Sequence, residues 1–514
     1  MKRRTGELLL LLLLAACLVF VLLDSARFFV RLDLTRTRAY TISPVSRRIL
    51  VALPDNVQVT YYLSDTLRSL SPAPGRVIDL LHEYATAARS RLAVAVLDPV
   101  RTGRVDSARR FGVLPQQIQV IQQNEQRTVD VFSGIVVEYL DRYTTLPAVF
   151  TPDGLEFNLS LAIRKLLAGK RLAVGVLIGR SDKSLARDYE NLRTGLSRDY
   201  SVREFLPGER IPPEVDALLV LGGVGLGADS LRPVDRYLWE GGRVLFAVKG
   251  LQVETLQTFG AEAAGPSPLL DLIASYGVRV GREMVLDTAA RDYRLPQQAD
   301  GKIVWESLGE YPPWVSVRSP NVAAGNPITA NFAGLDLLWP SALEAVPVEG
   351  VQAEAVVKTT SSAWIMREPF VVDPFRVPRS GGQGGEGQRV LVYALTGSFP
   401  SPFAPGAASR SLPTRLLVVG DDDFASDLML FSDSLYNVFF LQNAVLWLAG
   451  QADLLAIKTR APAEGRLDRI ADPVARGRLM RAAEILNVGV IPALVLLFGV
   501  LRLLRRRERK PGGR

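Results

Sequence analysis

Two apolar runs near the ends of the 514-residue chain constrain its fold more than any other feature. Residues 8–23 are apolar throughout, and residues 485–504 are apolar apart from Asn487 and Arg502. A stretch of about 20 apolar residues spans a bilayer, and basic residues favour its cytoplasmic side. Basic clusters lie outside both runs, at residues 2–4 and 505–510. We therefore expect two transmembrane helices in a bacterial inner membrane, with residues 1–7 and 505–514 as cytoplasmic tails.

Each run has an alternative interpretation. Residues 14–17 fit the site at which exported lipoproteins are cut and acylated on cysteine, here Cys17, although the apolar run continues six residues beyond it. The second run can be a buried core helix, but the arginine-rich sequence after it is typical of a membrane boundary. With two spans, the body between them is expected to be periplasmic or extracellular.

The net charge of +8 is located in the two tails. The first seven residues carry +2 and the last thirteen carry +6, so the body is about neutral. A basic face for nucleic acid is therefore not expected. The single cysteine and single histidine exclude a disulfide framework and zinc sites built from Cys and His clusters.

Residues 24–54 are expected to form a connector that contains a short helix starting at Ser43 and Pro44, with Val45, Ile49 and Leu50 on one apolar face. Residues 55–150 follow with strands at 57–63, 92–97, 118–121 and 129–139 and helices at 77–88 and 108–113. This order predicts a small α/β domain, and a thioredoxin-like fold is one arrangement that fits it. The segment has no cysteine, so thioredoxin redox chemistry is excluded.

Residues 155–450 are expected to form a larger α/β domain. Buried apolar runs at 172–178, 217–221, 244–248 and 416–419 alternate with helical patterns, which predicts a parallel sheet covered on both faces. An insertion at about 257–388 shows irregular patterning and many Pro and Gly residues. Within it, residues 379–388 are expected to be a flexible loop. Residues 451–484 form a second connector.

The first candidate site follows the strand at 172–178. Gly179, Arg180, Ser181 and Asp182 stand where a Gly-x-Ser-x-Gly nucleophile elbow would lie, but the fifth residue is Lys183. A Ser–Lys pair, a ligand contact and an ordinary loop all remain open. The histidine, His82, is in the preceding domain and is expected to be structural.

The second candidate site is a run of carboxylates, Asp421, Asp422 and Asp423, after the last predicted strand, with Asp427 near. Such a run can hold Mg²⁺ or Ca²⁺. The alternative is a helix N-cap with solvent-exposed charges. We expect no metal or cofactor.

A third segment, residues 222–227, is glycine-rich but lacks the G-x-G-x-x-G register, and the chain has no Walker motif. A flexible turn is the preferred interpretation, and ATP hydrolysis would belong to another chain.

In this order, the pieces resemble the GldG-like proteins, which are auxiliary components of an ABC-type transport system named for gliding motility. The resemblance spans nearly the whole chain, and its order is more specific than any one motif. It rests on residues 40–44 (Tyr-Thr-Ile-Ser-Pro), 189–192 (Tyr-Glu-Asn-Leu), 241–245 (Gly-Gly-Arg-Val-Leu), 338–341 (Leu-Trp-Pro-Ser), 359–364 (Thr-Thr-Ser-Ser-Ala-Trp), 420–424 (Gly-Asp-Asp-Asp-Phe), 443–450 (Asn-Ala-Val-Leu-Trp-Leu-Ala-Gly) and the arginine-flanked final run.

The resemblance implies a class I glutamine-amidotransferase-like fold for the larger domain, as in an intraflagellar-transport protein. It also implies a multispan permease and a separate cytoplasmic ATPase as partners, and a non-enzymatic role in transport of an unidentified substrate. Family members often show Gly-His-Gly-Glu where this chain has Gly179-Arg180-Ser181-Asp182, so a role of that His and Glu is not carried over. The competing functions are an envelope hydrolase of amidotransferase-like fold and a structural anchor for periplasmic machinery.

Overall fold

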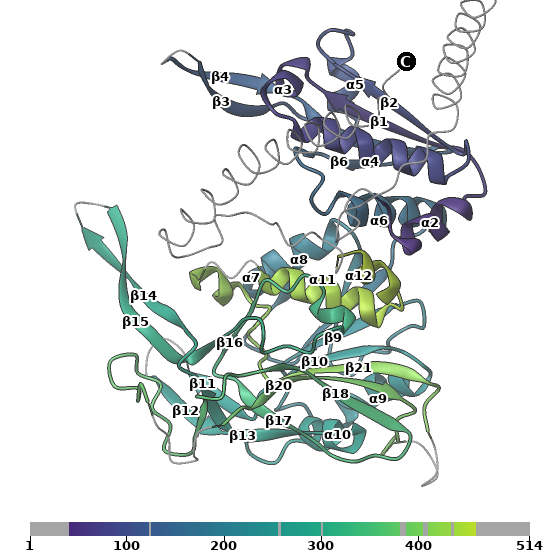
Figure 1. Cartoon of the computed structure of the whole chain (residues 1–514). Helices are drawn as coiled ribbons and strands as arrows, with labels where there is room; N and C mark the ends of the chain where they lie inside the picture. Colours follow the sequence, from purple (N-terminus) through teal and green to yellow (C-terminus); the bar gives the residue numbers. More distant parts are fainter. Residues whose placement is uncertain are drawn as a thin grey trace, which may run out of the picture. The chain divides into compact units, whose positions relative to one another are not determined.

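The computed structural model describes residues 41–122, 125–254, 259–299, 302–380, 387–403, 410–432 and 436–458 (Figure 1). All of them belong to the first of two compact units, which ends at Arg460. Both predicted transmembrane segments lie outside these residues. Among the residues described, no helix has the length and apolar character that a membrane span requires.

A four-stranded mixed sheet forms the first part of the body, in the order β2-β1-β5-β6. β1 is parallel to β2 and antiparallel to β5, and β5 is antiparallel to β6. The predicted strands at 57–63 and 92–97 are confirmed residue for residue. The elements are α2 (Pro44–Val51), β1 (Val57–Leu63), α3 (Asp65–Leu70), α4 (Ala73–Ala87), β2 (Leu92–Leu97), α5 (Val105–Arg110), β3 (Gln116–Gln122), β4 (Glu125–Val131), β5 (Ser133–Tyr139) and β6 (Arg142–Leu146).

One strand expected in this part is wrong. The apolar run at 129–139 is two strands, because β4 pairs with β3 in a separate hairpin and β5 joins the four-stranded sheet. Phe132 lies between them: its carbonyl oxygen accepts the Ser64 N–H, and its own N–H donates to the Ser64 hydroxyl. This contact fixes the point at which the chain changes sheets.

A ten-stranded sheet is the main part of the rest of the body, which also holds a separate three-stranded sheet and a separate two-stranded sheet. One half of the ten-stranded sheet is parallel, in the order β21-β10-β9-β7-β8. This confirms the predicted parallel sheet. β9 is buried along its whole length, as expected for a strand covered on both faces. The elements are β7 (Ala173–Ile178), α7 (Leu185–Asp188), α8 (Glu190–Ser197), β8 (Ser201–Phe205), β9 (Ala217–Leu221), α9 (Ala228–Trp239), β10 (Val244–Ala247), β21 (Thr414–Val419), η2 (Asp427–Ser432) and α11 (Tyr436–Leu448).

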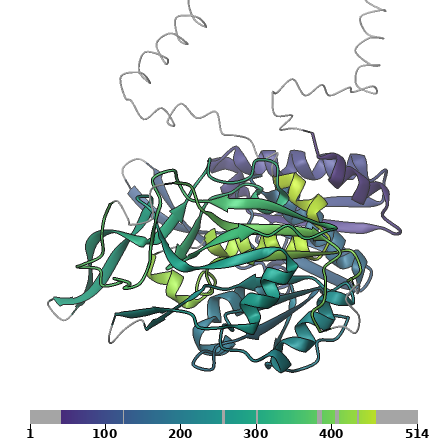
Figure 2. The same ribbon diagram turned by 90° about the horizontal axis from the view of Figure 1, so that it is seen from below.

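The two faces of this sheet belong to two apolar cores. Leu219 and Leu245 pack with α8 and α11 on one face, and Leu218 and Phe246 pack with α9 and α10 on the other. Figure 1 shows α11 above β9, β10 and β21 and α9 and α10 below them, and Figure 2 shows the same body from below. The helices therefore cover both faces of the parallel strands.

The segment from 251 to 397 is far more regular than its sequence suggests. β20 pairs antiparallel with β21 and continues the sheet through β17, β13 and β19, with β18 beside β20. The glycine-rich loop expected at 379–388 falls mostly outside the described residues. The elements are β11 (Leu251–Glu254), β12 (Gly260–Ala263), α10 (Pro268–Tyr276), β13 (Val278–Leu286), β14 (Ala290–Ala299), β15 (Lys302–Val317), η1 (Pro327–Thr329), β16 (Leu335–Leu338), β17 (Ser341–Ala345), β18 (Val351–Lys358), β19 (Trp364–Met366) and β20 (Val390–Gly397).

Two further helices link these parts. α6 (Leu155–Ala168) follows the first sheet in the chain and contacts β5, β6 and α2. α12 (Ala452–Lys458), the last described helix, contacts α6, α11 and α2. The short helix expected after Ser43 is confirmed as α2, and the Ser43 hydroxyl caps it by accepting from the Ser46 N–H.

Candidate functional site

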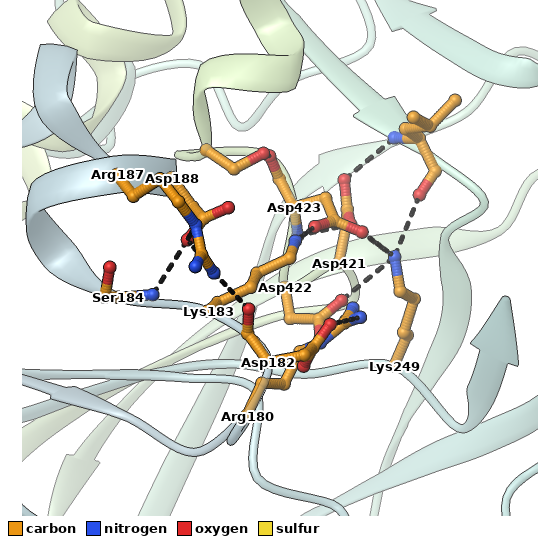
Figure 3. Close-up of polar contacts among 12 residues, drawn as sticks. Arg180, Asp182, Lys183, Ser184, Arg187, Asp188, Lys249, Asp421, Asp422 and Asp423 are labelled. Carbon is orange, nitrogen blue, oxygen red and sulfur yellow. Dashed lines mark hydrogen bonds and ion pairs between the residues drawn. The ribbon is translucent and has the colours of Figure 1, made fainter. Parts of the chain in front are cut away.

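The two sequence-predicted clusters meet at one edge of the parallel sheet (Figure 3). Gly179, Arg180, Ser181 and Asp182 follow β7, and the three aspartates at 421–423 follow β21. Because β7, β9, β10 and β21 are parallel, their carboxyl ends lie at the same edge. This is the edge where open α/β sheets bind ligands.

Lys249 stands at the centre of the cluster, and the sequence analysis does not identify it. It follows β10, and its side chain is buried. The ammonium nitrogen lies 2.6 Å from Asp423 Oδ2, 2.9 Å from Asp422 Oδ1 and 3.3 Å from Asp421 Oδ1. A lone lysine directly after a buried strand was the available signal, since a charge there needs a partner inside the protein.

Two more cations come from the segment after β7. The Lys183 ammonium donates to Asp423 Oδ1. Arg180 donates to both oxygens of Asp182, at 2.9 and 3.2 Å, and lies 4.0 Å from Asp422. The Asp422 oxygen nearest Lys249 has no hydrogen bond of its own, so that contact is electrostatic.

The aspartates are not the solvent-exposed N-cap that one interpretation expects. All three are buried, at 0%, 6% and 2% exposure for Asp421, Asp422 and Asp423. Asp421 accepts hydrogen bonds from the Leu338 N–H and the Asp423 N–H, each at 2.8 Å. Charges taken out of water need such compensation, which the lysines and backbone supply.

Asp427, beyond this run, does cap a helix, but one elsewhere in the chain. Its carboxylate accepts the backbone N–H groups of Glu190 and Asn191, at 2.8 and 3.1 Å. These residues begin α8, so the negative charge faces the positive end of that helix.

Burial and ion pairing act in opposite directions on the pKa values of the cluster. Burial by itself lowers the pKa of Lys249, but the attraction of the three aspartates outweighs it and raises that pKa well above the ordinary value. For Asp423, burial raises the pKa, and the attraction of Lys249 and Lys183 overcomes this and lowers it. For Asp421, burial outweighs the attraction of Lys249, and with the repulsion of Asp423 and Asp422 it raises the pKa to about 7. The lysine therefore stays charged at neutral pH.

The carboxylates offer the oxygen ligands of a Mg²⁺ or Ca²⁺ site, but a cationic side chain already lies among them. One oxygen from each of the three aspartates lies within 4.8 Å of the others. The Lys249 ammonium lies among the same oxygens and supplies the positive charge that a cation would bring. A divalent cation would have to displace a paired lysine, so these residues fit a buried ion-pair cluster better than a metal site.

Glycines bring the loops of this edge into close contact. A side chain at Gly179 would place its Cβ 2.3 Å from the Gly223 Cα. Gly222 has φ of +71° and Gly223 has φ of +113°, a region that favours glycine. The glycine-rich segment after β9 is therefore a closely packed turn at this position, and it leads to α9.

The remaining candidates do not form a catalytic pair. Ser181 is exposed, and the Lys183 ammonium that could serve as its base is bonded to Asp423. His82 lies on α4, which packs on the other sheet, and is exposed rather than part of the core.

Comparison with known proteins shows which family the chain is similar to. The model of a family described as an ABC-type uncharacterized transport system matches residues 171–449. A domain of unknown function (DUF7088) matches residues 36–138. An uncharacterized protein of Borreliella burgdorferi is 21% identical over 529 residues, which cover 99% of this chain and 100% of the relative.

The first match includes every residue of the ion-pair cluster and both halves of the ten-stranded sheet. Since it covers more than half of the chain, the protein belongs to this family of auxiliary components of an ABC-type transport system.

Proposed function

We propose that this chain is a non-enzymatic, GldG-like subunit of an ABC-type transporter, anchored in the membrane by two helices at residues 8–23 and 485–504. Its α/β body would lie outside the cytoplasm, where it contacts the cargo or another envelope protein. The family membership supports the transport role, and the sequence pattern at the two ends supports the anchoring.

The mutual pairing of the buried charges is the observation that carries the non-enzymatic role. A lysine that acts as a base or nucleophile needs a lowered pKa, whereas the pKa of Lys249 is raised. Lys183 is held by the same carboxylate, Asp423. At the edge where an α/β enzyme would place reactive groups, these head groups therefore bond to one another.

The two folds expected from the sequence remain part of this proposal. A thioredoxin-like first domain is supported by the β2-β1-β5-β6 order, with β5 antiparallel to β1, followed by α6. An amidotransferase-like second domain is supported by the parallel strands with helices on both faces. Neither domain would keep the chemistry of those folds.

The partners would be a permease and a separate cytoplasmic ATPase, because the sequence has no Walker motif and two helices cannot enclose a pore. Purification of the full chain from membranes in mild detergent tests this. We expect both partners to be recovered with it, and we expect recovery to fall when the chain is truncated before residue 485. Recovery of neither partner with the full chain would contradict the transport role and favour a structural anchor.

Two substitutions test the absence of catalysis separately. Ser181→Ala and His82→Gln should each leave a transport-dependent phenotype and the amount of protein unchanged, since both side chains are exposed and neither has a catalytic partner. A specific loss of the phenotype at normal abundance would favour the envelope hydrolase instead.

A further inference from the structure

The first and last described helices meet on a third helix. α2 begins at Pro44 and α12 ends at Lys458, and both contact α6 as well as each other. The chain therefore enters and leaves the described body at one place, although 400 residues separate the two helices in the sequence.

A polar stripe on α6 makes these contacts. Glu156, Ser160 and Arg164 are spaced four residues apart, so they lie along one side of the helix. Most of the other α6 residues are apolar and buried. The polar stripe therefore faces the neighbouring helices, and the rest of the helix surface packs in the core.

The first half of the stripe holds α2. The Glu156 carboxylate accepts the Ser43 N–H and the Ser46 hydroxyl, each at 2.6 Å. The Ser160 hydroxyl lies 2.9 Å from that of Ser46 and 2.7 Å from that of Tyr84, on α4. Because this network is largely buried, loss of one member leaves the others without partners.

The second half holds α12. Arg164 donates two parallel hydrogen bonds to Asp453, at 2.8 and 2.7 Å. The Lys458 ammonium lies 4.3 Å above the ring of Phe157, also on α6, and donates to Asn443 on α11 at 2.7 Å. α12 has only seven residues, too few for a stable helix alone, so these contacts hold it in place.

The apolar side of α6 joins the cores of both sheets. Leu159 and Ile163 belong to the same apolar cluster as Val137 of β5 and Val174 of β7. A displacement of α6 would therefore disturb packing in the four-stranded and the ten-stranded sheet together.

We propose that α6 couples the two ends of the body to each other and to both sheets, and that the Arg164–Asp453 pair is the contact that opens first. The pair is the more exposed of the two attachments, with side chains 26% and 40% exposed, whereas the α2 attachment is largely buried, with only Glu156 half-buried. A load on the segment after Lys458 would first break this pair and would then reach α2 through α6 and through the direct contact between α12 and α2. The coupling extends the proposed transport role but does not depend on the identity of the partners.

Amide hydrogen exchange on the full chain in detergent micelles tests the proposal without any partner. Arg164→Met and Asp453→Asn should each raise exchange in α12 about five-fold, as expected for the loss of roughly 1 kcal/mol. We expect a smaller rise, about two-fold, in α2 and no change in β10 or β21. The exchanged pair Arg164→Asp with Asp453→Arg should restore protection.

The matched control is Arg279→Met, which removes an exposed ion pair with Glu344 on the far part of the ten-stranded sheet and should leave α2 and α12 unchanged. A rise confined to α12 would overturn the coupling, because the two ends would then be held independently. An equal rise of hydrogen exchange in β10 and β21 would also overturn the coupling, because the Arg164–Asp453 pair would then only stabilise the whole fold. Either result leaves the proposed transport role untouched.

Discussion

Lys249 is the residue on which the buried cluster depends. It contacts all three aspartates, whereas Lys183 contacts only Asp423 and Arg180 only Asp422 among them. Breaking a buried ion pair costs far more than its net stabilisation, because the partner charge is left unpaired.

Lys249→Met should therefore lower the free energy of unfolding at pH 7 by about 3–5 kcal/mol. Urea unfolding of the purified protein measures it. Lys183→Met is the matched variant and should cost less, because Asp423 keeps Lys249. Equal losses for the two variants would show that Lys249 has no special place in the cluster.

The loss of unfolding free energy that Lys249→Met causes should become smaller as the pH falls from 7 to 5. Lys249 lowers the pKa of Asp421, so without the lysine burial holds that pKa still further above its value in the unfolded chain. Such groups stabilise the fold when they take up protons, so the stability of the variant rises as pH falls through the raised pKa. Unfolding curves at both pH values measure the change, and a deficit that grows toward pH 5 would contradict the assignment.

Lys458 shows the opposite case, because its half-buried ammonium contacts the neutral side chains of Asn443 and Phe157. Burial lowers its pKa to about 8. Because the folded pKa lies below the unfolded one, the charge opposes folding below pH 8, and stability rises as pH increases from 8 toward 10.5.

For this group the rise between pH 8 and 10 amounts to about 2 kcal/mol. Lys458→Met removes the ammonium but keeps an unbranched side chain of nearly the same length, and it should remove that rise. Unfolding curves at pH 8 and 10 give the change in unfolding free energy for the variant and for the unaltered protein. The difference between the two changes removes the contribution of the other titrating groups. Parallel pH dependence in the two proteins would show that Lys458 keeps its ordinary pKa.

At the level of the elements, the contact between the loops after β7 and β9 is the most sensitive to added volume. Gly179→Ala would force a Cβ to 2.3 Å from the Gly223 backbone, so we expect a loss of at least about 2 kcal/mol through displacement of one loop. Gly225→Ala, in the same turn, meets nothing within 4 Å and should be nearly neutral. Thermal unfolding compares them, and similar melting temperatures would show that the two loops separate at little cost.

Strands that are buried on both faces were the most predictable elements. β9 matches its prediction because five apolar residues in a row have few other interpretations. β8 was missed because only Phe205 of its five residues is buried, so it carries no apolar run. The strands between 251 and 397 were missed for a related reason, since β18 is half exposed and Pro and Gly interrupt the neighbouring segments.

The candidate site was predictable in its parts but not in its pairing. The positions of Arg180 and Asp421 at strand ends follow from the apolar runs before them. Their proximity depends on β21 lying beside β10, although a long insertion separates these strands in the sequence. No local pattern encodes that neighbourhood, so Lys249 could not be assigned to the aspartates.

For the whole molecule, the charges at the two ends of the sequence predict the membrane topology. We expect both termini in the cytoplasm, because basic clusters flank both apolar runs. A reporter that is active only in the cytoplasm should work when fused after residue 514 and stay silent when inserted among residues 381–386. Activity at the internal site, or silence at the C-terminus, would contradict the two-span topology.

The position of β21 inside the ten-stranded sheet determines when the body can finish folding. This strand lies between β10 and β20, yet it is made later than every other strand of the sheet. Until β21 has been synthesised, one edge of β10 is unpaired and can pair with another chain. Lys249 then also lacks its aspartate partners. The parallel half of the sheet therefore cannot be completed before residues 414–423 have been synthesised, and until then the incomplete sheet can associate with other chains.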